Sequence, residues 1–331
     1  MDLSVFFVGT AGSVPSRGRG LPAVLVQRGG ERLLFDCGEG TQRQLLRSIG
    51  LPDIERVFIT HFHADHWLGL PGMLKSFALR DRSAPLVVYG PRGLRQLMDA
   101  MLVVYGKRLP YKLDLIELEP WDEIDFPDFQ IASIPVTHKG NEAYAYVLTE
   151  DERPGEFDPA AAIDLGVDEG PLFGRLQRGE AVEVERDGRR VLVEPADVMG
   201  ESRLGRRVAF SGDTTPCEAL RFAADGAQLL VHESTFLTAD AERARETGHS
   251  TARQAALIAA DAGTQMLALT HISARYSARE MLDEARPVFE HTVAPRDFDT
   301  IVVPQPERGG PELVVWAERR GDPGIERVAS A

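Results

Sequence analysis

The residues best suited to chemistry lie in the segment His61-Phe62-His63-Ala64-Asp65-His66, which holds three of the chain's eight histidines. Imidazole nitrogens bind first-row metal ions such as zinc, and a carboxylate can complete the ligand set. The apolar run before this segment indicates a strand, and in extended backbone side chains two residues apart point the same way, so His61 and His63 can hold one ion together. Asp65 and His66 are neighbours and are expected to diverge, which suggests a second ion beside the first.

Three further ligand candidates each follow an apolar run that is typical of a strand: His138, Asp213 and His271. Sites are commonly built where strands end. One polar residue after a strand is ordinary. Three of them, together with residues 61–66, favour a single metal centre.

The composition is typical of a soluble globular chain with one large domain or two ordinary ones, since 43% of the 331 residues are hydrophobic and 27% are charged. No apolar run approaches the roughly 20 residues of a membrane span, so no membrane partner is expected. Cys37 and Cys217 are the only cysteines, which argues against a disulfide framework and favours the cytoplasm. The net charge of −14 argues against a nucleic-acid partner, although a local basic patch can sit on an acidic body.

Short apolar runs interleaved with helical patterns predict an α/β fold built in layers. Strands are expected at 3–9, 23–28, 32–36, 56–60, 86–89, 113–118, 129–135, 144–149, 207–210, 229–231, 266–269, 300–303 and 313–316. Helices are expected at 41–49, 72–79, 92–104, 216–224 with Thr215 as N-cap, 250–262 with Ser250 as N-cap, and after the capping box Ser277–Glu280. Residues 318–331 are expected to form a tail.

The composition changes over residues 150–204, which are rich in Gly, Pro and acidic residues. Alternating apolar residues on both sides of Asp187-Gly188 predict a β-hairpin over 182–193. No run in this section predicts a core helix or a long buried strand. We therefore expect an insertion that projects from the domain.

The motif at residues 60–66 resembles the signature of the metallo-β-lactamase superfamily. Other blocks resemble one of its families, the tRNase Z endoribonucleases that process the 3′ end of tRNA. These blocks extend over roughly residues 4–300 and are Phe35-Asp36-Cys37-Gly38-Glu39-Gly40-Thr41-Gln42, Gly69-Leu70-Pro71-Gly72, Phe210-Ser211-Gly212-Asp213-Thr214, His232-Glu233-Ser234-Thr235-Phe236, Gly248-His249-Ser250-Thr251 and Thr270-His271-Ile272-Ser273-Ala274-Arg275-Tyr276. The superfamily motif implies the fold and the metals. The last two blocks and the insertion point to the tRNase Z family.

This resemblance implies one metallo-β-lactamase domain over residues 1–331, a four-layer αβ/βα sandwich, with 150–204 as an inserted flexible arm. It also implies two zinc ions in each subunit. The expected ligands are His61, His63 and His138 for one ion, Asp65, His66 and His271 for the other, and Asp213 as the bridge. Two ions about 3.5–4 Å apart can deprotonate one water and neutralise a phosphate oxygen, so metal-bound hydroxide is expected to attack a phosphodiester.

The candidate general acid is His249, which the resemblance places where it can protonate the leaving ribose 3′-oxygen. From the residues alone, a histidine that only packs at a helix start is the simpler interpretation. Glu233 can accept a hydrogen bond from His249 and hold its proton. Asp65 is a further catalytic candidate besides being a ligand. Asp36 resembles an aspartate behind the metals that orients a histidine, with a turn or capping role as the alternative.

The insertion resembles an arm that grips the tRNA elbow. Its segment 170–179 carries Gly170, Pro171, Arg175 and Arg178, which suit phosphate contact, and a solvated loop is the alternative. Near the N-terminus, Pro15-Ser16-Arg17-Gly18-Arg19-Gly20 resembles a Pro-x-Lys-x-Arg-Asn loop that senses the CCA end, which makes Arg17 and Arg19 tRNA-binding candidates. Arg17 stands in place of Lys. Gly20 replaces Asn, which removes an amide that could read a base.

The resemblance therefore implies a zinc endoribonuclease that cuts precursor tRNA and leaves a tRNA 3′-hydroxyl and a trailer 5′-phosphate. It also implies a homodimer in which the arm of one subunit presents tRNA to the site of the other. A small-molecule hydrolase of the same superfamily, acting on a thioester, lactone or phosphodiester, would need neither the arm nor His249. A metal-binding scaffold without activity is disfavoured because every ligand position is filled.

Overall fold

A computed structural model describes residues 1–105, 109–140, 142–186, 188–316 and 325–328. The chain divides into two compact units. The main unit comprises Met1–Thr149 and the chain from Arg206 onward, and the inserted unit comprises Glu150–Gly205.

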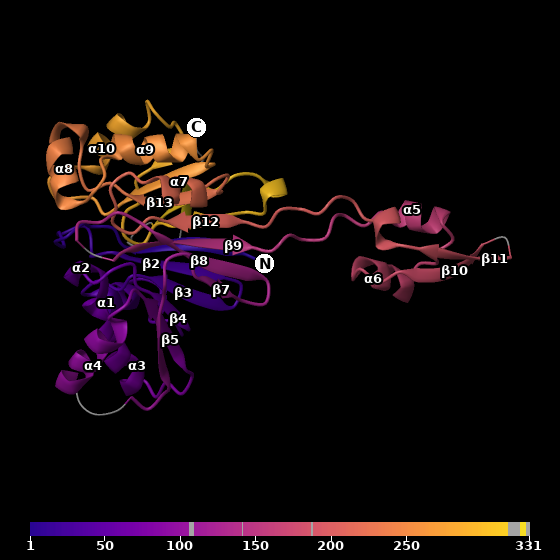
Figure 1. The fold of residues 1–331 in the computed structure, drawn as a ribbon, viewed down its shortest axis with the longest axis horizontal. Helices are drawn as coiled ribbons and strands as arrows, with labels where there is room; N and C mark the ends of the chain where they lie inside the picture. The colour runs from indigo at the N-terminus through magenta and orange to yellow at the C-terminus, as the bar shows by residue number, and fades with distance from the viewer. Residues whose placement is uncertain (106–108, 141, 187, 317–324, 329–331) are drawn as a thin grey trace. The chain divides into compact units, whose positions relative to one another are not determined.

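Two mixed β-sheets form the middle of the main unit (Figure 1). The nine-stranded sheet has the spatial order β18 (Ile325–Val328), β17 (Glu312–Trp316), β16 (Thr300–Val302), β1 (Leu3–Gly9), β2 (Ala23–Arg28), β3 (Glu31–Phe35), β4 (Arg56–Phe58), β5 (Leu86–Gly90) and β6 (Leu113–Glu117). The seven-stranded sheet has the order β15 (Thr292–Val293), β14 (Met266–Thr270), β13 (Leu229–Glu233), β12 (Arg207–Phe210), β9 (Tyr144–Glu150), β8 (Phe129–Pro135) and β7 (Glu123–Asp125).

Helices cover the outer face of each sheet, with an apolar cluster beneath them. The nine-stranded sheet is covered by α1 (Thr41–Arg47), α2 (Ala64–Trp67), α3 (Gly69–Leu79) and α4 (Leu94–Tyr105). The seven-stranded sheet is covered by α7 (Glu218–Ala223), α9 (Ala252–Asp261) and α10 (Ala278–Ala285), and α8 (Ala241–Thr247) contacts the turn at Thr238–Asp240. Short 3₁₀ turns lie at Pro195–Asp197, Thr238–Asp240 and Pro306–Arg308. The predicted αβ/βα sandwich is confirmed.

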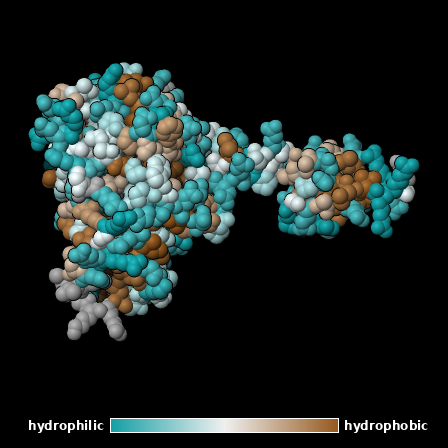
Figure 2. All heavy atoms as spheres, viewed as in Figure 1, coloured by the Kyte–Doolittle hydropathy of each residue, from teal (hydrophilic) through white to brown (hydrophobic). Residues whose placement is uncertain are grey.

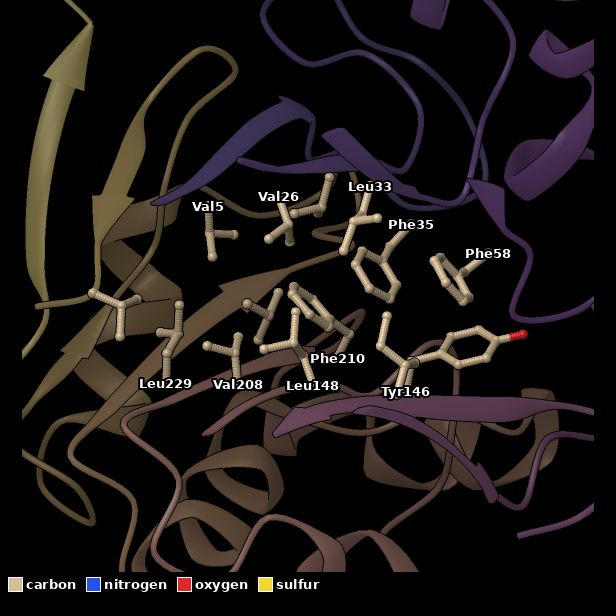
Figure 3. Close-up of a cluster of buried hydrophobic side chains, with 14 of the residues drawn as sticks. Val5, Val26, Leu33, Phe35, Phe58, Tyr146, Leu148, Val208, Phe210 and Leu229 are labelled. Atoms are coloured by element: carbon tan, nitrogen blue, oxygen red, sulfur yellow. The ribbon is translucent and has the colours of Figure 1, made fainter. Parts of the chain in front are cut away.

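A third apolar cluster fills the space between the two sheets, and aromatic rings dominate it near the ends of three strands (Figure 3). The ring of Phe35 stacks on Phe58 at a centroid distance of 5.0 Å and on Phe210 at 4.2 Å. Burying a large apolar side chain stabilises a fold by about 1.5–3 kcal/mol. Asp36 follows Phe35 directly, and Asp213 lies three residues after Phe210. The stacked rings therefore fix the strand ends from which polar residues extend.

Helix α9 begins one residue later than predicted. Its N-cap is Thr251, whose hydroxyl accepts a hydrogen bond from the Gln254 N–H while the Gln254 side chain accepts one from the Thr251 N–H. The predicted cap, Ser250, donates its own N–H to Glu233 and its hydroxyl to the carbonyl of Thr214. A glutamine three residues after Thr251 completes the capping box, which leaves Ser250 for other contacts.

Helix α7 also differs at its start. Its N-cap is Cys217, whose Sγ accepts a hydrogen bond from the Leu220 N–H at 3.4 Å. The predicted cap, Thr215, donates both its N–H (2.9 Å) and its hydroxyl (3.2 Å) to the carbonyl of Thr137. This contact ties the segment after Asp213 to the end of the strand that precedes His138.

Several elements of the main unit were not predicted, among them α2 and β15. Strand β7 is only three residues long, and α8 lacks an apolar stripe, with Ala244 as its one buried residue. The expected tail is wrong for Ile325–Val328, which form β18 and pair with β17. The rest of 318–331 lies outside the described residues. In contrast, the capping box at Ser277 and Glu280 is present at the start of α10.

The inserted unit has a small core of its own. The predicted hairpin is confirmed as β10 (Val182–Arg186) and β11 (Arg189–Val193), which pair in antiparallel register, while Asp187 lies outside the described residues. The expectation that no helix packs here is wrong, because α5 (Pro159–Asp164) and α6 (Pro171–Gln177) bury Ala162 and Leu176 against the hairpin strands. Both helices are too short for an apolar period to show in the sequence.

Hydrophilic side chains predominate on the face drawn in Figure 2, and apolar ones are scattered among them on both units. None of the described helices is long and apolar enough to cross a membrane.

Candidate metal centre

The topology brings several polar strand ends to one edge of each sheet. Strands β12, β13 and β14 are parallel neighbours, so their carboxyl ends lie together and place Asp213, Glu233 and His271 at one edge. In the other sheet β4 runs parallel to both β3 and β5 and leads into His61. These edges are where the centre forms.

The seven residues predicted as metal ligands converge in two groups. In each group the ligand atoms lie within 4.8 Å of one another, and the groups are His61, His63, His138 and Asp213, and Asp65, His66 and His271. Asp213 Oδ2 lies 3.2 Å from His66 Nε2 and 3.3 Å from His271 Nε2, so this carboxylate faces the second group as well as its own. Burial raises the pKa of Asp213, but the neighbouring His271 and His66 outweigh it and hold this pKa well below its usual range.

The expected divergence of Asp65 and His66 is wrong. Asp65 Oδ2 lies 3.6 Å from His66 Nε2 and 3.3 Å from His271 Nε2. The backbone leaves the extended conformation at His63, which is the N-cap of α2. Adjacent side chains on a helix are separated by about 100° and not by 180°, so both can face the same point.

Asp36 fixes the orientation of two of these histidines. Its Oδ2 accepts a hydrogen bond from His66 Nδ1 at 2.7 Å and another from the Thr60 hydroxyl at 3.0 Å. Since the Thr60 hydroxyl donates its proton to Asp36, it accepts from His61 Nδ1, which lies 3.0 Å away. Both rings therefore present an unprotonated Nε2 to the centre, which is the tautomer that binds a metal.

On the other sheet, the carboxylate of Glu233 likewise orients histidine rings. Its Oε2 accepts a hydrogen bond from the Thr235 hydroxyl at 2.8 Å, so that hydroxyl accepts from His271 Nδ1, also at 2.8 Å. Its Oε1 accepts one from His249 Nδ1 at 2.9 Å. The predicted contact between Glu233 and His249 is thus present, and the same carboxylate orients His271 through Thr235.

His138 is oriented by a glycine carbonyl. Its Nδ1 donates to the carbonyl of Gly248 at 2.7 Å, which leaves Nε2 free to bind. Gly248 has φ of +81° and caps α8 in the left-handed conformation. A Cβ there would come within 2.5 Å of the Lys139 backbone nitrogen. Only glycine allows this approach.

Two functional positions carry backbone strain. Asp36 and His271 have φ of +57° and +55°, in the left-handed region that L-residues other than glycine seldom adopt. Each such residue costs on the order of 1–3 kcal/mol and persists only where its surroundings impose it. The Asp36 N–H is held by the carbonyl of Phe58 at 2.8 Å, and the His271 ring is held by Thr235.

Some buried polar atoms at the centre have no partner among the described residues, and a bound cation would interact with them. His61 Nε2 and Asp213 Oδ1 have no hydrogen-bond partner among the described residues. His66 Nε2 lies 3.3 Å from His271 Nε2, and His138 Nε2 lies 3.0 Å from His63 Nδ1. Lone pairs this close repel unless a proton or a cation lies between them. Imidazoles with carboxylates are the donor set of zinc, so the residues fit bound zinc.

His249 lies beside the ligands and is nearly buried. Its ring centroid is 5.0 Å from that of His138 and 5.3 Å from that of His271. Burial lowers the pKa of His249, but the Glu233 carboxylate outweighs it and raises this pKa to about 9. At neutral pH the imidazole is therefore protonated, as a general acid must be.

The comparisons with known proteins agree with this geometry. A model of the metallo-β-lactamase superfamily matches residues 18–271. Ribonuclease Z of Gemmatimonas aurantiaca is 46% identical over 303 residues, which cover 90% of this chain and 95% of that relative. The chain belongs to the ribonuclease Z family. It is therefore an enzyme, a nuclease of the metallo-β-lactamase superfamily, as the sequence motifs predicted.

Other relatives support the assignment to the ribonuclease Z family. Ribonuclease Z of Methanosarcina acetivorans is 40% identical over 305 residues, covering 91% of this chain and 98% of its own. The crystal structure of the short form of human tRNase Z matches with a TM-score of 0.65 and 26% identity, over 91% of this chain and 99% of that one. A metallo-β-lactamase fold protein from Bacillus subtilis matches with a TM-score of 0.66 at 17% identity, which shows the fold alone.

In this ribonuclease Z family member, Arg175 and Arg178 lie in and just after α6 and not in a loop. Both are paired with Glu180, Arg175 at 3.0 Å and Arg178 at 3.3 Å. All three side chains are exposed, and such surface pairs are worth only about 0–1 kcal/mol, so phosphate can displace the carboxylate. Gly170 has φ of +140° and precedes Pro171 at the first position of α6, which gives both residues a structural role.

The two N-terminal arginines differ in their surroundings. Arg17 is exposed, and its side chain makes no hydrogen bond or ion pair with any other described residue. Arg19 is half-buried. Its Nη1 donates to the Thr10 hydroxyl, and it also donates to the carbonyl of Pro295, at 2.9 Å. Arg19 thus braces the N-terminal segment, and its contact with tRNA stays a prediction.

Sequence reasoning missed the two threonines. Thr60 and Thr235 connect His61 to Asp36 and His271 to Glu233. Thr235 belongs to the block His232–Phe236 that carries the resemblance, which is the signal that could have found it. It also missed Ser13, whose N–H donates to Asp65 Oδ2 at 2.9 Å across 52 residues of sequence.

Proposed function

We propose that this protein is a zinc-dependent endoribonuclease that removes the 3′ trailer from precursor tRNA, leaving a 3′-hydroxyl on the tRNA and a 5′-phosphate on the trailer. The observation that carries the proposal is the meeting of the predicted ligands with His249, whose Nδ1 is held by the buried carboxylate of Glu233. The relatives named ribonuclease Z support the substrate. Incubating the protein with labelled precursor tRNA, with and without a chelator, and mapping both product ends tests it.

His61, His63 and His138 would hold one zinc ion and Asp65, His66 and His271 the other, with Asp213 shared. Bound zinc supplies a water that ionises near neutral pH and neutralises charge on the phosphate. Asp65 Oδ2 accepts a hydrogen bond from the Ser13 N–H, and in this proposal the Asp65 carboxylate also accepts one from the attacking water. His249 Nε2 then donates its proton to the leaving ribose oxygen, while Nδ1 stays bound to Glu233.

The pH dependence of turnover should depend on Glu233. The imidazolium of His249 is present below its pKa and is lost as the pH rises through it, so activity should fall at high pH. Replacing Glu233 with Gln keeps the shape and removes the charge that raises this pKa. We expect the basic limb of the kcat profile to move to lower pH by about 1–3 units, because that is what an adjacent opposite charge is worth.

The matched control for this change is Glu246→Gln, an exposed glutamate on α8 three residues before His249. It should leave the profile unchanged. A Glu233→Gln enzyme whose basic limb stays in place would show that another group donates the proton.

The inserted unit is proposed to bind the tRNA body through Arg175 and Arg178. Replacing both with alanine should raise KM for precursor tRNA about tenfold at unchanged kcat, since alanine cannot make charge-assisted hydrogen bonds to phosphate. Hydrolysis of a small phosphodiester should be unaffected. The dependence of KM on salt should also become less steep.

Arg189→Ala with Arg190→Ala is the control, because these residues of β11 lie in the same unit and remove the same charge. An unchanged KM in the α6 variant, or a larger loss in the β11 variant, would place the RNA contact elsewhere.

We also propose that the protein works as a homodimer in the reducing cytoplasm. Both cysteines are free thiols, and Cys37 is buried. Light scattering of the purified protein tests the oligomeric state.

A further inference from the structure

A cavity of about 660 Å³ lies in the main unit beneath the N-terminal segment. Residues 15–20, helix α1, residues 296–299 and the end of β17 line it. Its lining includes five arginines against three carboxylates, in a chain whose net charge is −14. Arg17 and Arg19 are the tRNA-binding candidates of the N-terminal loop, and the other three arginines have no part in the mechanism described above.

The carboxylates of Asp297 and Asp299 in the lining are already engaged. Asp297 accepts hydrogen bonds from the Thr10 hydroxyl at 2.7 Å and from the Gly20 N–H at 2.6 Å. Asp299 accepts from the backbone N–H groups of Arg296 and Trp316, both at 2.8 Å. These hydrogen bonds hold the walls together, and the charges of the two carboxylates also act on Arg19 and Arg296.

Most of the arginines, in contrast, are available to a ligand. Arg17, Arg43 and Arg296 are exposed, and their side chains make no hydrogen bond or ion pair with another described residue. Arg47 lies 5.8 Å over the ring of Phe298 and donates only to a neighbouring glutamine. Guanidinium groups that converge on a cavity bind phosphate oxygens well.

An aromatic surface accompanies these charges. Trp316 is partly exposed at the cavity wall, and its ring lies edge-on to Phe298 at 6.1 Å. Arginines beside an indole are the combination that binds unpaired nucleotides, because the phosphates meet guanidinium groups and a base meets a flat ring.

The first residues of the cavity lining follow closely in sequence after Ser13, a residue that contacts the metal centre. Ser13 donates its N–H to the ligand Asp65, and the cavity lining starts two residues later. Consecutive Cα atoms are 3.8 Å apart, so the Cα atoms of Ser13 and Arg17 are separated by at most about 15 Å. A few nucleotides of extended RNA bridge such a distance.

We propose that this cavity binds the unpaired 3′ trailer of the substrate, with phosphates on Arg43, Arg47, Arg296 and Arg17 and a base against Trp316. The inference rests on the proposed function. The trailer is favoured over the tRNA body because the acceptor stem next to the cleavage point is a duplex, which is too wide for a cavity of this size, whereas a trailer is single-stranded.

The test compares precursor tRNAs that carry a trailer of one nucleotide or of about ten, the range a single-strand site covers. For the unaltered enzyme, the longer trailer should lower KM. The double variant Arg43→Ala with Arg47→Ala should raise KM about tenfold on the long-trailer substrate and leave the one-nucleotide substrate unchanged. The control is Arg95→Ala with Arg279→Ala, two exposed arginines outside the cavity, which should behave as the unaltered enzyme.

Binding of a single-stranded RNA oligonucleotide to the metal-free protein gives a second readout. The variant should bind about tenfold more weakly, with a salt slope smaller by roughly two, one for each phosphate that is no longer neutralised by an arginine. Equal binding, or an equal loss on both substrates, overturns the assignment. Oligonucleotide binding without cleavage of any precursor by the unaltered enzyme would overturn the proposed function and keep the cavity as an RNA site.

Discussion

Replacing Asp213 with Asn should reduce turnover about 10²–10³-fold, the loss expected when a main electrostatic group of a site is removed. The carboxylate faces His61, His66 and His271 at 3.7, 3.2 and 3.3 Å, and its Oδ1 has no partner among the described residues. An amide offers one oxygen in place of two and brings N–H donors, which cannot bind a cation. The substitution therefore removes both the shared ligand and the charge that balances two ions.

The measurement is the zinc content of purified protein alongside its turnover of precursor tRNA. The variant should bind less zinc than the unaltered protein and remain folded. Asp99→Asn, on the exposed face of α4, provides the same chemical change away from the centre and should keep both zinc and activity. A fully loaded and active Asp213→Asn enzyme would contradict its place as the bridging ligand.

Replacing His249 with Asn should lower kcat about 10²–10⁴-fold while the bound zinc is unchanged, because a general acid contributes a factor of that size. The side chain contacts Glu233 and lies beside the ligand rings without belonging to either of the two groups predicted to hold the ions. The basic limb of the pH profile should disappear as well, since the group that loses its proton there is gone.

His291→Asn is the matched control, since His291 is exposed just before β15 and its ring contacts only Phe289, edge-on, among the described aromatic rings. It should leave kcat unchanged. A His249→Asn variant that loses its zinc would make this histidine a ligand and not an acid, a possibility raised by its closeness to Asp213 and His271. A variant with normal kcat would show that the acid is a different residue.

The convergence of the candidate ligands could be predicted from the sequence because apolar runs mark strands, and His138, Asp213 and His271 each follow one. The spacing also predicted that His61 and His63 lie together, and both belong to one group that could hold an ion. What the sequence could not show is how the chain turns after them. Asp65 and His66 converge because a helical turn starts at His63, a local change that four residues are too few to signal.

The hydrogen bonds that orient the candidate ligands could not be predicted from the sequence, because they join residues that are distant in sequence. Thr60 reaches back 24 residues to Asp36, and Thr235 reaches 36 residues forward to His271. Which strands become neighbours decides these pairs, and no local pattern carries that information. The cap of α9 is a related case, since the N–H of Ser250 is directed to Glu233, 17 residues away, and Thr251 caps the helix instead.

In the inserted unit, amino-acid composition did not predict all of the secondary structure. A section rich in Gly, Pro and charge suggested a loop and one hairpin, but α5 and α6 pack on that hairpin around residues such as Val167 and Leu176. Arg175 and Arg178 both pair with Glu180, which follows them in sequence. Their proposed role now depends on how readily phosphate replaces that carboxylate.

The most direct test of the account is a zinc titration of metal-stripped protein, with bound zinc measured by elemental analysis and turnover of precursor tRNA measured on the same samples. The account predicts that stripped protein is inactive, that activity returns as zinc binds, and that full activity coincides with two ions per chain. Stripped protein that cleaves precursor tRNA at the full rate would contradict it.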